Sequence, residues 1–306
     1  MKKFLIHCTV IIFIVLFGVG FISVVFPEKT ASFKIQDKGT YPDYLSIVAC
    51  FKNEAPYLKE WIEYHHMLGV DRFYLYNNES DDNFMEVLRP YINSGLVVYT
   101  NWPGKAQQIP IYADAIKKIK DKTRWAAIID IDEFILPMEV DSIPELLKDY
   151  EDYGALAMFW RGFDSNGHVQ KPDGLVIENY TRVHKDPKMP LIDGAYAGYY
   201  IKSIINPRLV VGLNDPHYFY MRDNLQCVDE NFIPILGTVS IYHTSKKIRL
   251  NHYYSKSEEE YFRKINRNRA TGKPKYAIDP NRYKFSLTQQ DTTILRFLPE
   301  LKKRMK

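Results

Sequence analysis

The chain is poor in cysteine. Its 306 residues include only three cysteines, and Cys8 lies inside an apolar segment near the N-terminus. Only Cys50 and Cys227 are left to form a disulfide, and one possible bridge is not the framework of several disulfides that stabilises small secreted domains. The sequence therefore excludes a disulfide scaffold, and its cysteines say little about the compartment.

The chain also lacks a strong excess of charge of either sign. Its formal net charge is +4, and we find no internal repeat and no low-complexity tract. Because proteins that track nucleic-acid phosphates usually carry a concentrated basic stripe, this balance gives no reason to expect a nucleic-acid partner. With 46% hydrophobic residues the composition is globular, and the length suits one large domain or two small ones.

One long apolar run lies near the N-terminus. Residues 4–26, FLIHCTVIIFIVLFGVGFISVVF, contain no charged side chain and follow Lys2 and Lys3. As a helix they would span roughly 34 Å at about 1.5 Å per residue, enough to cross a bilayer core. A cleaved signal peptide would have a shorter apolar region and a small-residue cleavage site. We therefore expect an uncleaved single-pass signal anchor of type II, with residues 1–3 as a cytosolic tail.

After the anchor the apolar pattern changes. Residues 27–43 are polar and without an apolar period, which predicts a short stem; from residue 44, strand-length apolar runs alternate with helical periods. Strands that alternate with helices in this way form βαβ units around a parallel sheet. We expect strands at 44–51, 72–78, 96–102 and 124–135, and helices at 55–70, 83–95 and 108–120.

These elements predict an α/β fold with a Rossmann-like, mostly parallel sheet flanked by helices. Residues 44–137 form the expected nucleotide-binding half. Residues 138–300 are richer in loops, and we expect them to bind the acceptor, with a further strand at 154–160 and a helix at 257–270 that begins with a capping box.

The stretch WAAIIDIDEFILP ends an expected strand in three carboxylates, Asp130, Asp132 and Glu133. Ligands of parallel sheets bind at the carboxyl ends of the strands, where a turn can aim two aspartates at one ion. Their hard oxygen atoms suit Mg²⁺ or Mn²⁺, with substrate phosphates and water completing the coordination. Capping of a turn, or pairing with Lys or Arg, is the alternative role for a bare Asp-x-Asp.

The motifs around this strand resemble a known family. FKNE (51–54), YNNES (76–80), DIDEF (130–134) and NHYYSKS (251–257) follow in the order and spacing of the GT-A glycosyltransferases of family 92 and the related family-2-like group. The resemblance covers residues 44–269. It implies a GT-A domain over residues 44–300 that transfers a sugar from a nucleotide donor with inversion.

The resemblance also implies roles for particular residues. The nucleotide sugar would be held by polar residues that follow the first, second and fourth strands and by one lysine: Asn53, Glu54, Asn77, Asn78, Asp81, Asp130 and Lys256. For any one of the Asn and Asp residues, turn formation is the competing role.

The metal would be held by Asp130, Asp132 and His252, with His217 and His243 as competitors for the histidine position. Glu133 would support these ligands without binding the ion. Lys256 would contact the diphosphate. For the other basic residues of this region, Arg263, Lys264, Arg267 and Arg269, we expect a solvated helix face.

Inversion needs a carboxylate that takes the proton of the acceptor hydroxyl. The loop-rich half offers Asp164, Asp193 and Asp215, and we predict Asp164, which lies just past the fifth strand. Asp164 also departs from the family pattern, which has Gly after Phe163.

These observations predict a metal-dependent inverting hexosyltransferase that uses a nucleotide sugar, with UDP as the expected nucleotide, on a glycan or other saccharide acceptor. In a eukaryote it would lie in the Golgi. The non-enzyme alternative is a membrane-anchored glycan-binding or scaffolding protein with a degenerate fold. A dehalogenase-type phosphatase is disfavoured because Phe134 stands where Thr or Val is required. One conflict remains, since the sequon at Asn78 would place a glycan in the expected uracil loop; a second sequon lies at Asn179.

Overall fold

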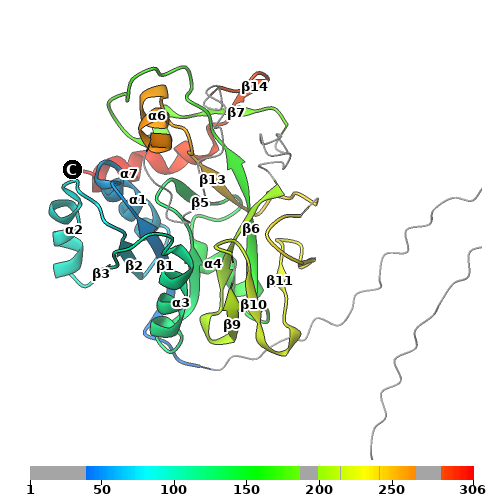
Figure 1. Cartoon of the computed structure of the whole chain (residues 1–306). Helices are drawn as coiled ribbons and strands as arrows, with labels where there is room; N and C mark the ends of the chain where they lie inside the picture. The colour runs from blue at the N-terminus through cyan, green and yellow to red at the C-terminus, as the bar shows by residue number, and fades with distance from the viewer. Residues whose placement is uncertain (1–38, 187–198, 214, 241, 267–283) are drawn as a thin grey trace, which may run out of the picture. The chain divides into compact units, whose positions relative to one another are not determined.

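The computed structural model describes residues 39–186, 199–213, 215–240, 242–266 and 284–306 (Figure 1). The expected cytosolic tail, the anchor at 4–26 and most of the stem lie outside these ranges. Within them, no helix combines the length and the apolar composition needed to cross a membrane.

The first half of the chain alternates strands and helices, as expected. Its elements are β1 (Asp43–Phe51), α1 (Ala55–Met67), β2 (Arg72–Asn77), α2 (Phe84–Asn93), β3 (Val97–Asn101), α3 (Gln108–Ile119) and β4 (Thr123–Ile128). β1 pairs in parallel with both β2 and β4, and β2 pairs in parallel with β3. The prediction of an α/β fold with a mostly parallel sheet is confirmed.

The expected strand at 124–135 is wrong, because it is two strands. β4 ends at Ile128, and a turn follows in which the Glu133 amide donates to the Asp130 carbonyl over 3.1 Å. β5 (Glu133–Pro137) then leaves the neighbours of β4 and pairs antiparallel with β13 (Ile248–His252). The turn therefore carries both aspartates, and the chain changes direction at the ligand edge.

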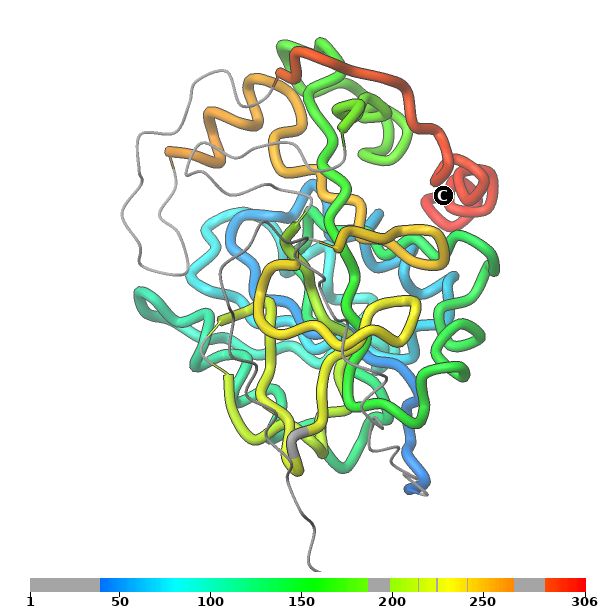
Figure 2. The backbone as a smooth tube through the Cα atoms, turned by 90° about the vertical axis from the view of Figure 1, so that its right-hand side faces the viewer, coloured from blue at the N-terminus to red at the C-terminus, as the bar shows by residue number. Residues whose placement is uncertain are grey.

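The second half completes the sheet with strands of both directions. β8 lies antiparallel between β4 and β6, and the path through the sheet is β12-β11-β6-β8-β4-β1-β2-β3. β13 also runs parallel to β6, which Figure 2 shows as two adjacent segments of the tube. The remaining helices and strands are α4 (Ile143–Leu147), β6 (Ala155–Gly162), α5 (Val176–Asn179), β7 (Arg182–His184), β8 (Ile201–Ile205), β9 (Val210–Leu213), β10 (Phe219–Met221), β11 (Cys227–Val228), β12 (Pro234–Ile235), α6 (Glu258–Asn266), β14 (Thr288–Gln290) and α7 (Leu298–Arg304).

The structure also tests the predicted helix at 257–270 and the possible disulfide between Cys50 and Cys227. The expected helix at 257–270 is present as α6 up to Asn266, and the rest of that range lies outside the described residues. Its capping box is confirmed, because the Glu260 amide donates to Ser257 Oγ over 3.3 Å and the Ser257 amide donates back to the Glu260 carboxylate over 3.0 Å. Cys50 and Cys227 are both free thiols.

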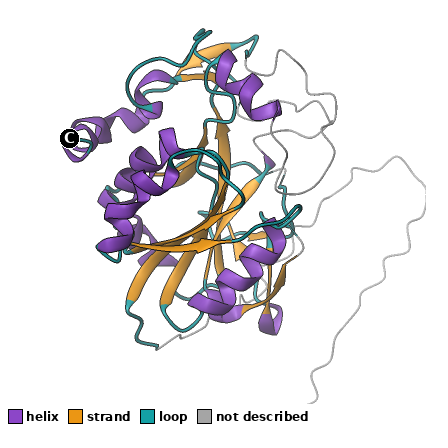
Figure 3. Ribbon diagram, turned by 60° about the vertical axis from the view of Figure 1, so that its left-hand side comes forward, coloured by secondary structure: helices purple, strands orange, loops and turns teal. Residues whose placement is uncertain are grey.

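Helices cover both faces of the sheet (Figure 3). Leu45, Ile47 and Ala49 of β1 belong to the apolar core shared with α1, whereas Val48 packs in the core on the α3 side. This alternation along one strand is the reason why β1 reads as a continuous apolar run.

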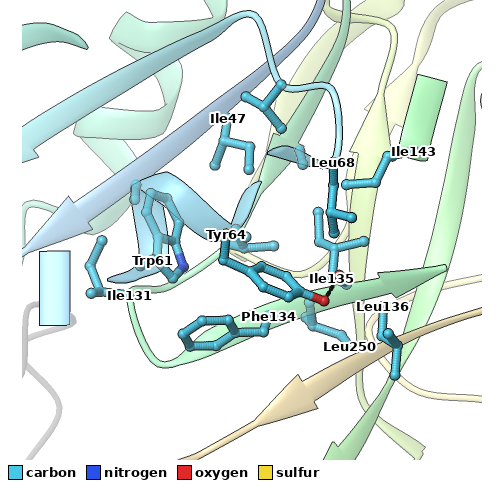
Figure 4. Close-up of a cluster of buried hydrophobic side chains, with 14 of the residues drawn as sticks. Ile47, Trp61, Tyr64, Leu68, Ile131, Phe134, Ile135, Leu136, Ile143 and Leu250 are labelled. Carbon is cyan, nitrogen blue, oxygen red and sulfur yellow. Dashed lines mark hydrogen bonds between the residues drawn. The ribbon is translucent and has the colours of Figure 1, made fainter. Parts of the chain in front are cut away.

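α1 fixes β5 through its buried aromatic face. Figure 4 shows Trp61 and Tyr64 of α1 against Phe134 and Ile135 of β5. The Trp61 indole N–H donates to the Glu133 carbonyl over 2.8 Å, and the Tyr64 hydroxyl donates to the Ile135 carbonyl over 3.0 Å. Because β5 begins directly after Asp132, these bonds also hold the end of the turn that carries the two aspartates.

Candidate active site

The ends of β1 and β2 lie at the same edge of the sheet as the turn after β4, because β1 is parallel to both β2 and β4. Asn53 has a left-handed backbone with φ of 55°, which Asn tolerates better than most residues. Its amide donates to Ser80 Oγ over 2.9 Å, and its side-chain oxygen accepts from the Asp81 amide over 2.9 Å. The Asp81 side chain is exposed. The structure thus brings Asn53 and Asp81 together, and their binding of a nucleotide stays a prediction.

Asn77 and Asn78 close the second loop, and both are buried. Asn77 accepts the Ser80 amide over 2.9 Å. The Asn78 side-chain nitrogen donates to the carbonyls of Trp102 and Gly104, each over 2.9 Å. Both hydrogens of that amide are therefore in use, and a glycan could not be carried there without opening this loop. In the folded protein the sequon at Asn78 is closed.

The two aspartates of the turn after β4 have different partners. Asp130 Oδ2 lies 3.0 Å from Lys202 Nζ, and its backbone amide donates to Glu133 Oε2 over 2.8 Å. Asp132 is buried and instead faces His252 and Lys264. The two carboxylates therefore contact different lysines, and their binding to one metal ion stays a prediction.

Lys202 of β8 is a fully buried cation at this turn. Its ammonium lies between Asp130 and Glu133, 3.5 Å from Glu133 Oε2. Burial alone would lower the pKa of Lys202, but the carboxylates of Asp130 and Glu133 outweigh it and raise that pKa. Burial raises the pKa of Glu133, against the charge of Lys202. Glu133 Oε1 has no hydrogen-bond partner among the described residues. Lys202 is a site residue that the sequence did not assign.

Asp132 and His252 form the pair that suits a metal ion. His252 ends β13, and the register places it opposite Glu133, so His252 Nε2 lies 3.7 Å from Asp132 Oδ2. Burial alone would raise the pKa of Asp132, but Lys264 and His252 hold it well below its usual value. Burial lowers the pKa of His252 and so favours the neutral imidazole that binds metals.

The donor set of this pair fits a phosphate-bound Mg²⁺ or Mn²⁺. One carboxylate oxygen and one imidazole nitrogen leave room for the oxygens of a diphosphate and for water. In the part of the chain that the structure describes, no group of three or more His, Cys, Asp or Glu side chains gathers as a metal cluster.

Lys256 brings a second cation to the site. It is buried, has a left-handed backbone with φ of 52°, and its ammonium lies 4.2 Å from the centre of the Tyr57 ring. Burial lowers the pKa of Lys256, and the charges of Glu54 and Asp132 oppose this shift. Within the described ranges, no hydrogen bond or ion pair engages this ammonium. In the described structure, Lys256 is therefore a buried cation without a counter-ion beside Asp132 and His252, and such a cation is suited to an anionic ligand.

The structure places Asp164, the predicted general base, in an ion pair with Arg182. Asp164 is fully buried, and both of its oxygens bond the Arg182 guanidinium over 2.8 and 2.9 Å. Oδ1 also accepts from the Asn166 amide and Oδ2 from the Phe285 amide. A base must reach the acceptor hydroxyl, and this carboxylate is enclosed by its own partners.

The other two candidates for the general base are Asp193 and Asp215. Asp193 lies outside the described residues. Asp215 is half-buried, and its Oδ1 accepts from the His217 amide over 2.8 Å. The His217 ring contacts Trp160, and Trp160 in turn contacts His252, with ring centres 5.1 and 4.4 Å apart. The ring of His217, two residues after Asp215, therefore contacts Trp160 beside His252, and Trp160 is a second site residue that the sequence did not assign.

The structure also places His217 and His243, the two alternatives to His252 as the metal-binding histidine. His243 lies against Phe159 of β6, with ring centres 5.1 Å apart. His217 Nδ1 bonds the Ile201 carbonyl over 2.7 Å, so the hydrogen of its neutral ring is on Nδ1. Of the three histidines, His252 is the one within 4 Å of Asp132.

Comparison with curated proteins gives relatives from plants. A glycosyltransferase family 92 protein of Oryza sativa subsp. japonica is 26% identical over 189 residues, which cover 60% of this chain and 31% of that protein. One from Arabidopsis thaliana is 26% identical over 207 residues, covering 63% of this chain and 34% of that protein. The chain spans about a third of the length of these relatives.

Comparison with solved structures gives weaker likenesses. A crystal structure of S. aureus TarS in complex with UDP-GlcNAc is 12% identical, with a TM-score of 0.35, over 54% of this chain and 46% of that one. Glucosyl-3-phosphoglycerate synthase from Mycobacterium tuberculosis, in complex with Mn²⁺, UDP and glucosyl-3-phosphoglycerate, is 16% identical, with a TM-score of 0.27, over 39% and 44% of the two chains. These scores are too low to carry an argument about this chain.

The family is decided by a separate comparison. The family model for glycosyltransferase family 92 matches residues 46–233, which is more than half of the chain and includes the ends of β1, β2 and β4. The chain therefore belongs to glycosyltransferase family 92.

Proposed function

We propose that this chain is a metal-dependent, inverting GT-A glycosyltransferase that moves a hexose from a nucleotide sugar, with UDP as the nucleotide, to a glycan or other saccharide acceptor. The observation that carries the proposal is the pair formed by Asp132 and His252 beside the buried ammonium of Lys256. Few ligands other than a metal diphosphate suit a carboxylate, an imidazole and an unpaired cation at the carboxyl edge of a parallel sheet.

In this proposal the chain binds the two ends of the donor separately. Asn53 and Asp81 lie at the nucleoside side, and Asp130 faces the ribose while Lys202 keeps its carboxylate in place. Asp132 and His252 would hold Mn²⁺ or Mg²⁺, and Lys256 the diphosphate. When bound, a divalent ion would neutralise the diphosphate and make it a better leaving group.

For the general base we propose Asp215 in place of Asp164. Of these two carboxylates, Asp215 is the half-buried one, and one of its oxygens is held by its own loop. The His217 that it bonds through the backbone amide contacts Trp160, and Trp160 contacts His252. A carboxylate with one oxygen fixed can accept the acceptor proton on the other.

The test is a hydrolysis and transfer screen over nucleotide sugars with Mn²⁺, using the wild type and Asp132→Asn. We expect activity with a UDP-linked hexose, its loss in excess chelator, and its loss in Asp132→Asn at unchanged thermal stability of the fold. Full activity of the variant, or activity in chelator, would contradict a metal held by Asp132.

The competing function is the glycan-binding or scaffolding protein, and one observation favours it: Lys264 contacts the oxygen of Asp132 that a metal would need. UDP titration with and without Mn²⁺ separates the two, since a degenerate binder should show no metal-dependent affinity for UDP.

We further propose that residues 4–26 anchor the chain in a membrane as a single-pass, type II protein, in the Golgi if the host is eukaryotic. The apolar run in the sequence supports this proposal. Protease protection of the catalytic domain in sealed membranes would test the orientation.

A further inference from the structure

Lys264 points into the candidate site, not to solvent as the sequence suggested. It lies on α6 four residues after Glu260, so the two side chains share one face of the helix. That face is held against the body of the protein because Glu260 accepts hydrogen bonds from the hydroxyls of Tyr57 and Tyr180. The anchored first turn therefore directs Lys264 inward.

The Lys264 ammonium is held by three groups. It forms an ion pair with Asp132 Oδ2, donates to the Tyr254 carbonyl over 3.0 Å, and lies 3.8 Å from the centre of the Tyr254 ring. Its side chain is only 20% exposed. Arg263, its neighbour, is 65% exposed and pairs with Glu259 on the outer face of α6.

The ammonium and the proposed metal need the same atom. Lys264 contacts Oδ2 of Asp132, and His252 Nε2 is 3.7 Å from that same oxygen. A divalent ion bound to Oδ2 and Nε2 would face the ammonium at close range, and two cations cannot share one carboxylate oxygen without strong repulsion.

We propose that Lys264 is a donor-site residue with two positions: it is the counter-ion of Asp132 before the metal binds, and it binds the diphosphate once the metal has displaced it. The proposal rests on the proposed function. A lysine suits this exchange because its ammonium is a point charge on a flexible stem. The metal repels the ammonium from Asp132, and the diphosphate supplies a new anion within the same site, where Lys256 already faces it.

The two positions predict effects of opposite sign. Removing the ammonium removes a competitor, so the protein alone should bind Mn²⁺ more tightly. Removing it also removes a phosphate contact, so the protein loaded with Mn²⁺ should bind UDP more weakly. A lysine that merely stabilises the fold would not change the two affinities in opposite directions.

The experiment uses the full chain in detergent, with Lys264→Met and Lys264→Gln as test variants and Arg263→Met as the matched control. Binding of Mn²⁺ without nucleotide is followed by the electron paramagnetic resonance signal of the free ion, and binding of UDP at saturating Mn²⁺ by calorimetry. Thermal unfolding of each variant shows whether it is folded. We expect about tenfold tighter Mn²⁺ binding and about fivefold weaker UDP binding in both Lys264 variants, and no change in the control.

Unchanged Mn²⁺ affinity in folded Lys264 variants would overturn the proposal, and so would tighter Mn²⁺ binding without weaker UDP binding. Asp132→Asn reports separately on the proposed function. If it binds Mn²⁺ as tightly as the wild type, the ion lies elsewhere and the proposed metal site fails, whatever the Lys264 variants show.

Discussion

His65 should make the fold sensitive to acid at the point where α1 holds β5. Its ring is fully buried; Nδ1 bonds the Trp61 carbonyl over 2.8 Å, and Nε2 accepts from the Ile135 amide over 3.1 Å. A carbonyl only accepts and an amide N–H only donates, so the ring must be neutral with its hydrogen on Nδ1. A proton on Nε2 would face the Ile135 amide hydrogen and break the bond to β5.

The magnitude follows from the pKa of His65, which burial lowers to about 3. The unfolded chain has an ordinary histidine pKa of about 6.5, so on acidification the unfolded state binds the proton first. The contribution of neutral His65 is thus complete above about pH 6.5 and is lost as the pH falls toward 3. A pH of 5 lies about 1.5 units below the pKa of the unfolded chain, and each unit lowers the free energy of unfolding by about 1.4 kcal/mol. The free energy of unfolding should therefore be about 2 kcal/mol smaller at pH 5 than at pH 7.5.

The assay is urea unfolding at pH 7.5 and pH 5, followed by the fluorescence of the buried Trp61 and Trp125. His65→Gln can still offer an acceptor near Ile135 but does not titrate. The exposed neighbour provides the control His66→Gln. We expect the wild type and the control to lose about 2 kcal/mol more on acidification than His65→Gln. Equal losses in all three proteins would refute the role assigned to His65.

The other predictions concern the candidate site. Asp164→Asn leaves Arg182 without its carboxylate, so it should lose about 3 kcal/mol of unfolding free energy while the folded fraction keeps its kcat. Asp215→Asn should instead lower kcat and leave the free energy of unfolding unchanged. Chemical denaturation and steady-state kinetics of both variants distinguish the two roles. Lys202→Met leaves the fully buried Glu133 and the partly buried Asp130 without their cation, and it should lower the free energy of unfolding by about 3 kcal/mol. A Lys202→Met protein as stable as the wild type in thermal unfolding would contradict the ion pair between Lys202 and Asp130.

The first half of the fold could be predicted because its information is local. The apolar residues of β1 and α1 repeat with the period of their own element, and each parallel strand is followed by its own crossover helix. The end of β4 could not be placed in the same way. β5 exists because it pairs with β13, more than a hundred residues later, and nothing in DIDEF shows that partner.

The same limit explains Asp164. Its position in the sequence, just past a strand at the ligand edge, is that of a catalytic carboxylate. Its role is decided by Arg182 and by the amide of Phe285, which come from distant segments. Lys264 is the converse case, because a basic residue in a charged helix reads as solvent-exposed until the first turn of that helix is seen to be anchored at Glu260.

Asp130 and Asp132 form ion pairs with different lysines, Lys202 and Lys264. Lys202 is fully buried between two carboxylates, and their charges raise its pKa, so it stays charged and in place. Lys264 reaches Asp132 from the surface helix α6 and keeps a fifth of its side chain exposed. Removing Lys202 from Asp130 would leave buried charge without a partner, whereas Lys264 can leave Asp132 toward water or an anion. In the proposed site, Asp132 is therefore the carboxylate that would exchange its lysine for a metal ion, while Asp130 would keep its lysine and face the nucleotide.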